Sequence, residues 1–418
     1  MSQSGLNPVY AANEARGEWT AAEAALIDRA RELAPVLRER AAAAEQTRHI
    51  PDATHAAFRD AGFYRVFQPA RYGGLEARYG LHTLLAAETA RGCASSAWAL
   101  SVTACHAWIL GMFPRDAQDE VWGEDPARAV ASSFLGVGPK LVAEKGGIRL
   151  SGRWRFSSNV DHCGAAVLLA MLPGAGGAVP HFVLVHRDQY AIEDTWRTVG
   201  LAATGSNDIV IKDAFVPPHR VLDVIATRDG RAPGAEANAH YLYRLPLFAC
   251  LPHSLIGAAL GAALGAVEQI VTDLAGRASV ANVKIAEQQT IQARIAEAAA
   301  ELEAASALLQ VDRARINDLG RSLQMPDDAT RQQLRLNVGY AAKLCVQAVE
   351  RLMPVVGGRG LELHHAFQRA WRDVHAVAQH IALVWDVQAL LTRISIRWNS
   401  FNTLSTTCCA SLVSLASD

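Results

Sequence analysis

The stretch IRLSGRWRFSS, residues 148–158, decides the fold, because similar runs of β-branched and aromatic residues recur through this part of the chain. The others are AAVLLAML (165–172), HFVLVHR (181–187) and NDIVIKDAFV (207–216). Glycine, proline and aspartate separate these runs, and that pattern is typical of strands joined by turns. Residues 126–232 are therefore predicted to form a central β domain of roughly 100 residues, a common domain size.

Helical patterns lie on both sides of this β domain. Residues 1–125 are predicted to form an N-terminal helical domain, in which Thr20 and Glu23 make a capping box before the first helix. Residues 233–418 are predicted to form a C-terminal four-helix bundle, because residues 285–316 alternate apolar and charged faces with helical period. The order of helices, strands and helices places the chain in the α+β class.

Charge and composition narrow the classes of partner. The 418 residues carry 40 basic and 41 acidic side chains, so no net field attracts nucleic acid or acidic lipid. Seven scattered cysteines predict reduced thiols in a cytoplasmic protein. The N-terminus lacks a secretory pattern. Residues 245–267 are long enough to span a membrane, but prolines interrupt their first half, so a buried core helix is predicted.

Four motifs together resemble the acyl-CoA dehydrogenase fold over essentially the whole chain. They are GRWRFSSN (152–159), VGLAATGSNDIVIKDAFVPPHRV (199–221), GGRG (357–360) and RAWRDVH (369–375). The resemblance implies a central β-barrel or sandwich domain and a flavin bound between it and the C-terminal helices. It also implies a homotetramer.

The resemblance assigns the end of the GRWRFSSN motif to the flavin ring. Ser158 takes the place of a hydroxyl residue beside flavin N5, with Phe156 and Ser157 beside the ring. A hydroxyl both donates and accepts, so it suits a nitrogen whose protonation changes with redox state. The alternative is an ordinary strand end with a turn-forming serine.

The resemblance also implies cofactor contacts from the helical bundle. Arg277 and Gln289 take the places of residues that hold the cofactor across a subunit interface, and an arginine fork suits a phosphate. A solvated helix-end arginine is the alternative for Arg277. Gly357 and Gly358 let a backbone approach a cofactor closely, although glycine is also a common C-cap. FMN and FAD both remain open.

The chain departs from the dehydrogenase pattern where that family most often carries its catalytic glutamate. His380 stands at that position, and no Glu-Gly follows. This departure resembles a second branch of the fold, the oxygenase components of two-component flavin monooxygenases related to 4-hydroxyphenylacetate 3-hydroxylase and phenol hydroxylases. Residues that resemble this branch occur at 95–108, 131–136, 152–164 and 243–248.

The branch implies a reduced flavin (FMNH2 or FADH2), O2 as co-substrate, a C4a-hydroperoxide and a separate NAD(P)H-flavin reductase. A small phenol is the simplest substrate, and histidine suits the base that deprotonates it. His380 is predicted as this base, His106 as a substrate contact, and Ser133 with Ser158 as residues that flank the flavin. For His380 the alternative is a bundle histidine whose ring is hydrogen-bonded to a backbone or carboxylate partner. For His106 it is a core histidine with its hydrogen bonds made inside the protein, and for Ser133 it is a strand-edge serine.

His375 is expected to be structural or to lie on the rim, because five residues of regular helix turn it about 140° away from His380. No grouping has metal-ligand spacing, so no metal is expected. The leading hypothesis is a reduced-flavin monooxygenase that hydroxylates a phenol-type aromatic. The alternatives are an acyl-CoA dehydrogenase-type flavoenzyme, N- or S-oxygenation of an amine, indole or thiophene, and a flavin-binding subunit without chemistry of its own.

Overall fold

The computed structural model describes residues 19–174, 176–274 and 284–392. The capping box predicted before the first long helix is present: the Glu23 amide donates to Thr20 Oγ1 at 3.2 Å, and the Thr20 amide donates to the Glu23 carboxylate at 2.9 Å. Every residue of α4 and α5 is buried. The N-terminal helices are α2 (Ala21–Thr47), α3 (Asp52–Asp60), α4 (Leu81–Ala90), α5 (Ala94–Leu110) and α6 (Arg115–Trp122).

The strands form two four-stranded sheets with the orders β1-β4-β5-β8 and β2-β3-β7-β6. Apolar residues from both sheets, among them Trp154 and Val183, share one core. Among the described residues, the predicted β domain is therefore a sandwich and not a closed barrel. The strands are β1 (Val130–Ser133), β2 (Leu135–Glu144), β3 (Gly147–Ser157), β4 (Ala165–Gly174), β5 (Gly177–His186), β6 (Ala191–Glu193), β7 (Asn207–Val216) and β8 (Val221–Asp223).

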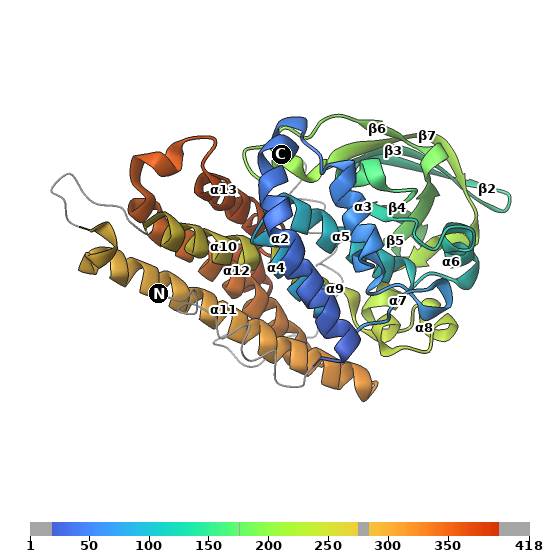
Figure 1. The fold of residues 1–418 in the computed structure, drawn as a ribbon. Coiled ribbons are helices and arrows are strands. Elements are labelled where there is room, and N and C mark those ends of the chain that lie inside the picture. Colours follow the sequence, from blue (N-terminus) through green and yellow to red (C-terminus); the bar gives the residue numbers. More distant parts are fainter. Residues whose placement is uncertain (1–18, 175, 275–283, 393–418) are drawn as a thin grey trace.

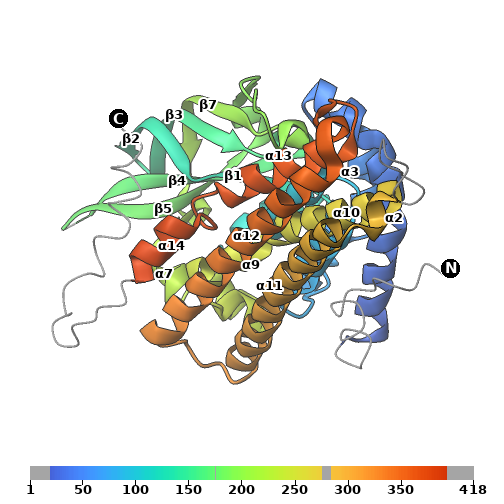
Figure 2. The same cartoon turned by 90° about the vertical axis from the view of Figure 1, so that its left-hand side faces the viewer.

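Helices return after the sandwich, as the sequence predicts. Figure 2 shows α10, α11, α12 and α13 side by side, and these helices pack against one another. One described stretch, Leu247–Leu274, is long and apolar enough to cross a membrane, and 94% of its most apolar window is buried. The helices are α7 (Val224–Arg228), α8 (Gly234–Ala237), α9 (Leu247–Leu255), α10 (Gly257–Leu274), α11 (Gln289–Arg321), α12 (Asp328–Val356), α13 (Ala366–Ala378) and α14 (Trp385–Thr392).

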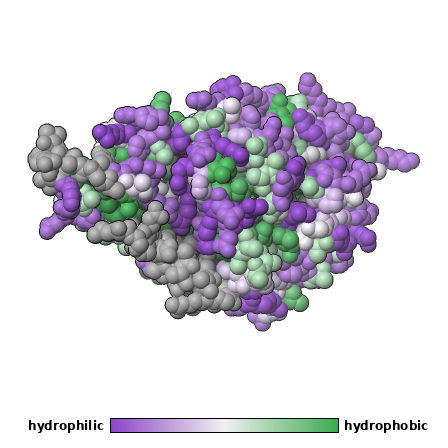
Figure 3. Space-filling view, viewed as in Figure 1, coloured by the Kyte–Doolittle hydropathy of each residue, from purple (hydrophilic) through white to green (hydrophobic). Residues whose placement is uncertain are grey.

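Helix α5 connects the two halves of the molecule. It contacts strand β1 of the sandwich and helix α10 of the bundle, and Figure 1 shows it between them. The surface in Figure 3 is mostly hydrophilic, with hydrophobic residues in small separate groups. Every residue of α5 is buried, so its polar side chains lie at the internal boundary between the sandwich and the helices. Ligand sites often form at such boundaries.

Candidate active site

The turn at the end of β3 has an unusual backbone. Phe156 and Asn159 have φ angles of 63° and 58°, in the left-handed region that side chains other than glycine rarely adopt. The pairing of β3 with β7 also shifts register between Trp154 and Ser157. Strained backbone of this kind persists where surrounding contacts hold it, often at functional sites. The strain here brackets Ser157 and Ser158, the serines that the sequence assigned to the flavin.

Ser158 begins a chain of hydroxyl contacts that crosses the base of the sandwich. Its Oγ accepts from the indole N–H of Trp98 on α5 at 3.0 Å and lies 2.7 Å from Ser206 Oγ. Ser206 Oγ lies 2.6 Å from Thr204 Oγ1, which donates to the Leu201 carbonyl at 2.9 Å. We call this set, from Trp98 to Leu201, the Ser158 chain.

The two ends of the Ser158 chain favour one direction for its protons. An indole N–H can only donate and a carbonyl can only accept, while each hydroxyl has one proton. Because Thr204 gives its proton to Leu201, Ser206 donates to Thr204 and Ser158 donates to Ser206. Ser158 Oγ is left with one lone pair for a further contact. Ser158 Oγ can therefore accept one more hydrogen bond.

Leu201 is held at both its backbone amide and its backbone carbonyl. Its φ is 52°, again left-handed. Its amide donates to the Asp373 carboxylate at 2.6 Å, and its carbonyl also accepts from the Trp196 indole at 2.8 Å. Burial raises the pKa of Asp373 to about 7, although the bond from Leu201 lowers it in part. The end of the Ser158 chain is thus fixed by helix α13 and by Trp196.

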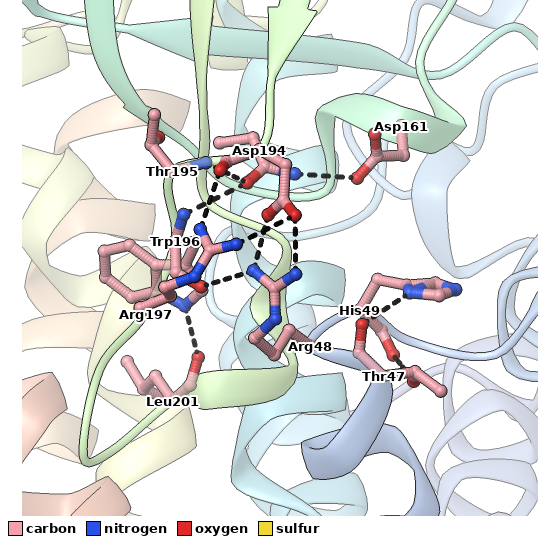
Figure 4. A network of polar contacts seen from close by, with 10 residues as sticks. Thr47, Arg48, His49, Asp161, Asp194, Thr195, Trp196, Arg197 and Leu201 are labelled. Atoms are coloured by element: carbon pink, nitrogen blue, oxygen red, sulfur yellow. Dashed lines mark hydrogen bonds and ion pairs between the residues drawn. The ribbon is translucent and has the colours of Figure 1, made fainter.

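A second polar network holds the loop that carries Trp196, as Figure 4 shows. Arg48, at the end of α2, forms an ion pair with Asp194 through both guanidinium ends and donates to the Trp196 carbonyl at 3.1 Å. Asn207 Oδ1 accepts from the Thr195 and Trp196 amides, each at 3.2 Å. These contacts come from an N-terminal helix and from β7, so the loop is anchored from two directions.

His106 lies on α5 eight residues beyond Trp98, about 80° further around the helix. Its Nδ1 lies 3.0 Å from the Val130 carbonyl, and its Nε2 lies 2.6 Å from Ser132 Oγ. The carbonyl can only accept, so the proton is on Nδ1, and Nε2 accepts from Ser132. Burial lowers the pKa of His106 to about 4, so it is neutral at pH 7. We call this set the Ser132 chain.

Ser133, which the sequence placed beside the flavin, has a different partner from its neighbour Ser132. Its hydroxyl donates to the Arg155 carbonyl on β3, and the Leu135 amide donates to it at 3.4 Å. Successive side chains of a strand point to opposite faces. Ser132 therefore faces His106, while Ser133 joins β1 to β3.

His380 lies in the connection between α13 and α14, because α13 ends at Ala378. Its ring packs on Trp98 with centroids 5.4 Å apart, and its Nδ1 accepts from the Ala382 amide at 3.2 Å. Burial lowers the pKa of His380 to about 4. The ring is thus neutral with its proton on Nε2.

His375, as expected, lies apart from this group. Its Nε2 contacts the Glu350 carboxylate at 2.8 Å, with both side chains partly exposed. It is a rim histidine on α13. The regular-helix angle used to separate it from His380 does not apply, since the helix ends between them.

The predicted cofactor residues of the bundle are not brought to the β3 turn within the described chain. Gln289 is exposed at the start of α11, and Arg277 lies outside the described residues. Gly357 ends α12 with φ 68°, and the space beside both Gly357 and Gly358 is open. In Figure 1 the start of α11 and the end of α12 lie away from the sheets. The role of Arg277 and Gln289 across a subunit interface stays a prediction, and so does the close approach of Gly357 and Gly358 to a cofactor.

One open cavity has a volume of about 460 Å³, and its lining residues include His55, Arg59, Arg128 and His162. None of the predicted site residues lines it. The candidate site is therefore defined by the side chains around α5 and β3 and not by this cavity.

The residues around the β3 turn fit a flavin. Ser157 Oγ is buried without a hydrogen-bond partner in the described chain, and Ser158 keeps one free acceptor position. Phe156 exposes 47% of its surface and meets Trp196 edge to face at 5.8 Å. An unpaired buried hydroxyl is costly unless a ligand or water satisfies it. Polar groups and aromatic rings together suit a planar, heteroatom-rich ring.

Several residues of this site were not identified from the sequence. They are Trp98, Ser132, Thr204, Ser206 and Asp373. The spacing of Trp98 and His106 by eight residues was an available signal, because it places them about 80° apart around α5. Nothing in a single sequence indicates that Asp373 binds a peptide 172 residues away.

Comparisons with known proteins agree with this geometry. Residues 20–128 match the model for the acyl-CoA dehydrogenase N-terminal domain, and residues 254–385 match that for the acyl-CoA dehydrogenase C-terminal domain. These matches define the class of the fold and cover the helical parts on both sides of the sandwich.

Relatives identify the branch within that class. The chain is 37% identical over 375 residues to the oxygenase component of an FADH2-dependent resorcinol hydroxylase from Rhizobium sp. strain MTP-10005, covering 86% of this chain and 91% of the relative. It superimposes on 3-HSA hydroxylase from Rhodococcus sp. RHA1 with a TM-score of 0.84 and 32% identity, covering 88% and 95%. XiaF from Streptomyces sp., solved with FADH2 and glycerol, gives 0.81 and 27%, covering 88% and 94%. The chain therefore belongs to the oxygenase components of flavin-dependent monooxygenases with the acyl-CoA dehydrogenase fold.

Proposed function

We propose that this protein is the oxygenase component of a two-component, reduced-flavin-dependent monooxygenase that hydroxylates a small phenol. The observation that carries the proposal is the Ser132 chain. A carbonyl holds the proton of His106 on Nδ1, so Nε2 is a base connected to a serine hydroxyl at a buried boundary. A phenol needs such a group, because loss of its proton makes the ring carbon a better nucleophile. The names of the relatives support a phenolic substrate and FADH2.

Ser132 and His106 move the substrate proton in this proposal. Ser132 already donates to His106 Nε2, so its lone pairs can accept the hydroxyl proton of a phenol. As that proton reaches Ser132 Oγ, the serine proton passes to Nε2, and Val130 stabilises the imidazolium through Nδ1–H. A buried neutral histidine with a pKa of about 4 is a weak base, so transfer is expected to accompany bond formation at the ring carbon.

We propose a role for His380 that differs from the base that the sequence suggested. A base at Nε2 would have to carry its proton on Nδ1, and that would break the contact from the Ala382 amide. We therefore assign His380 as a donor whose Nε2–H stabilises negative charge on the substrate oxygen. Its contact with Trp98 places it beside the Ser158 chain.

Reduced flavin supplies the electrons that activate dioxygen. In this proposal Ser158 Oγ would accept a hydrogen bond from flavin N5–H, and Ser157 and Phe156 would contact the ring. Trp98 packs beside Ser158 and limits the access of water, since only 5% of its surface is exposed. We propose that Arg277, Gln289, Gly357 and Gly358 contact the cofactor from a second copy in a homotetramer. A separate NAD(P)H-flavin reductase would supply the reduced flavin.

The dehydrogenase alternative has less support. It requires a carboxylate base over the flavin, but the position expected for that base carries His380. The nearby carboxylate that can be traced, Asp373, accepts from the Leu201 amide. We further propose a cytoplasmic location, in keeping with five free, buried cysteines among the described residues.

A coupled assay tests the function. The protein is mixed with a flavin reductase, NADH, FAD and each of a panel of phenols, and products are identified by mass spectrometry. Hydroxylated products that require both proteins are expected. In parallel, the FAD-loaded protein is mixed anaerobically with acyl-CoA thioesters. Bleaching of the flavin by an acyl-CoA, together with no hydroxylated phenol, would favour the dehydrogenase instead.

A further inference from the structure

The hydroxyl protons of the Ser158 chain can be arranged in more than one way, and the protein by itself favours the arrangement that keeps every bond of the chain. In the arrangement described above, every hydroxyl from Ser158 to Thr204 donates toward the Leu201 carbonyl. In the reverse arrangement, Thr204 donates to Ser206, Ser206 donates to Ser158, and Ser158 donates outward. The reverse arrangement loses the bond from Thr204 to Leu201, so it costs about one net hydrogen bond.

These two arrangements match different redox states of a flavin. Reduced flavin has a hydrogen on N5 and needs an acceptor, whereas oxidised flavin has a lone pair there and needs a donor. The arrangement that the protein favours makes Ser158 an acceptor. It therefore matches the reduced ring, and binding the oxidised ring requires the costly reversal or leaves N5 without a partner.

We propose that Ser206 and Thr204 are positioning residues that give this protein its preference for reduced over oxidised flavin, by holding the Ser158 hydroxyl as an acceptor. The inference rests on the proposed function, in which Ser158 lies beside N5. Ser206 and Thr204 act only through Ser158. The anchored Leu201 peptide, fixed by Asp373 and Trp196, is the acceptor that sets the direction.

A positioning role can be distinguished from a general structural role, because each hydroxyl of the Ser158 chain bonds to the next one. Ser206→Ala removes the acceptor of Ser158 and frees its proton for outward donation. Thr204→Val removes the acceptor of Ser206, whose proton then turns toward Ser158. Both changes act at a distance from the ring, and both are expected to lower the preference in the same direction.

The test compares dissociation constants for FADH2 and FAD under anaerobic conditions, by following protein fluorescence or by ultrafiltration. In Ser206→Ala and in Thr204→Val, the ratio of the FAD constant to the FADH2 constant should fall about fivefold, the factor given by one net hydrogen bond of about 1 kcal/mol. Ser206→Thr keeps the hydroxyl and should restore the ratio. Thr89→Val is the matched control, because the buried Thr89 hydroxyl bonds, among the described residues, only to carbonyls of its own helix.

A second readout uses the protein without flavin. Trp98 donates to Ser158, and hydrogen bonds in a chain strengthen one another. In protein with nitrogen-15-labelled tryptophan, the Trp98 indole proton resonance, assigned by its loss in Trp98→Phe, should move upfield in Ser206→Ala and stay in place in Thr89→Val.

The outcomes separate this inference from the proposed function. If the unaltered protein binds neither FADH2 nor FAD, the proposed function fails and the inference with it. If it binds FADH2, but the ratio and the Trp98 resonance are unchanged in both Ser206→Ala and Thr204→Val, the inference alone is overturned. A ratio that falls equally in Thr89→Val would also overturn it.

Discussion

Two hydrogen-bond chains each include one residue of α5, and both end at a backbone carbonyl. The Ser132 chain ends at Val130, and the Ser158 chain ends at Leu201. In each, the carbonyl can only accept, so all protons point toward it and the serine at the open end becomes an acceptor. The difference is the middle of each chain: His106 can be protonated, whereas Ser206 and Thr204 cannot at any ordinary pH.

This difference teaches how similar geometry can serve two tasks. A chain with an imidazole can remove a proton from its ligand, because the imidazole holds the charge. A chain of hydroxyls can only accept a hydrogen bond and leaves the proton on the ligand. We therefore assign the Ser132 chain to the substrate, which must lose a proton, and the Ser158 chain to a flavin, whose N5 hydrogen must be retained.

The largest expected effect comes from removing the imidazole from the Ser132 chain. Glutamine can keep contacts to Ser132 and Val130 but cannot act as a base, so His106→Gln should lower the rate of hydroxylation about 100-fold or more. The affinity for FADH2 should change little. Product formation in the coupled assay and anaerobic FADH2 titration measure the two effects. A variant that hydroxylates at the unaltered rate would show that the chains do not differ in function.

The next effect comes from shortening the Ser158 chain at its open end. Ser158→Ala removes the proposed acceptor of the N5 hydrogen, so the dissociation constant for FADH2 should rise about tenfold, as expected for loss of a hydrogen bond. More of the electrons should also end in hydrogen peroxide, measured per product formed. Unchanged FADH2 affinity and peroxide release would remove Ser158 from the flavin site.

The dependence of stability on pH provides a smaller effect, with opposite signs for His106 and for Asp373, which anchors the end of the Ser158 chain. Burial lowers the pKa of His106 to about 4, from an ordinary value of 6.5. As the pH falls, the unfolded chain therefore binds this proton before the folded protein does. The contribution of His106 to the free energy of unfolding is present above pH 6.5 and is lost as the pH falls toward 4. Burial raises the pKa of Asp373 to about 7, from 3.8. Its contribution is present below pH 3.8 and lost as the pH rises through 7.

Urea unfolding between about pH 4.5 and 6.5 measures these slopes, each at most about 1.4 kcal/mol per pH unit. In Asp373→Asn, which keeps an acceptor for Leu201, the free energy of unfolding should rise more steeply with pH than in the unaltered protein. In His106→Gln it should rise less steeply. Identical slopes in all three proteins would contradict the assigned pKa shifts.

The smallest effect is expected at the rim histidine. The pair of His375 with Glu350 is partly exposed, and such pairs contribute about 0.5 kcal/mol or less. His375→Ala should leave hydroxylation unchanged, whereas His380→Ala should lower it about tenfold through loss of a hydrogen-bond donor. Equal hydroxylation rates in the two variants would show that His380 has no role in the reaction, despite its contact with Trp98.

The sequence predicted the architecture better than the contacts of the site. The order of domains followed from local patterns, such as the capping box at Thr20 and the β-branched run of β3, and the structure confirms the α+β fold. Local patterns report local backbone preferences, so they succeed where neighbours in sequence decide the outcome.

The site depended on contacts that local patterns do not encode. Ser132 and Ser133 are adjacent and chemically identical, and only the register of β1 against α5 decides which of them faces His106. The role of His380 depended on where α13 ends, since the Ala382 amide determines its tautomer. The role predicted for Gln289 concerns a second copy, which one chain does not contain.

The most direct test of the central claim follows oxygen from O2 into the product. The protein, a flavin reductase, NADH, FAD and a phenol that it hydroxylates are incubated under oxygen-18 gas in ordinary water. The account predicts that each new hydroxyl contains one oxygen-18 atom, and that His106→Gln forms far less labelled product while still binding FADH2. A hydroxyl that carries oxygen from water, or labelled product formed equally well by His106→Gln, would contradict it.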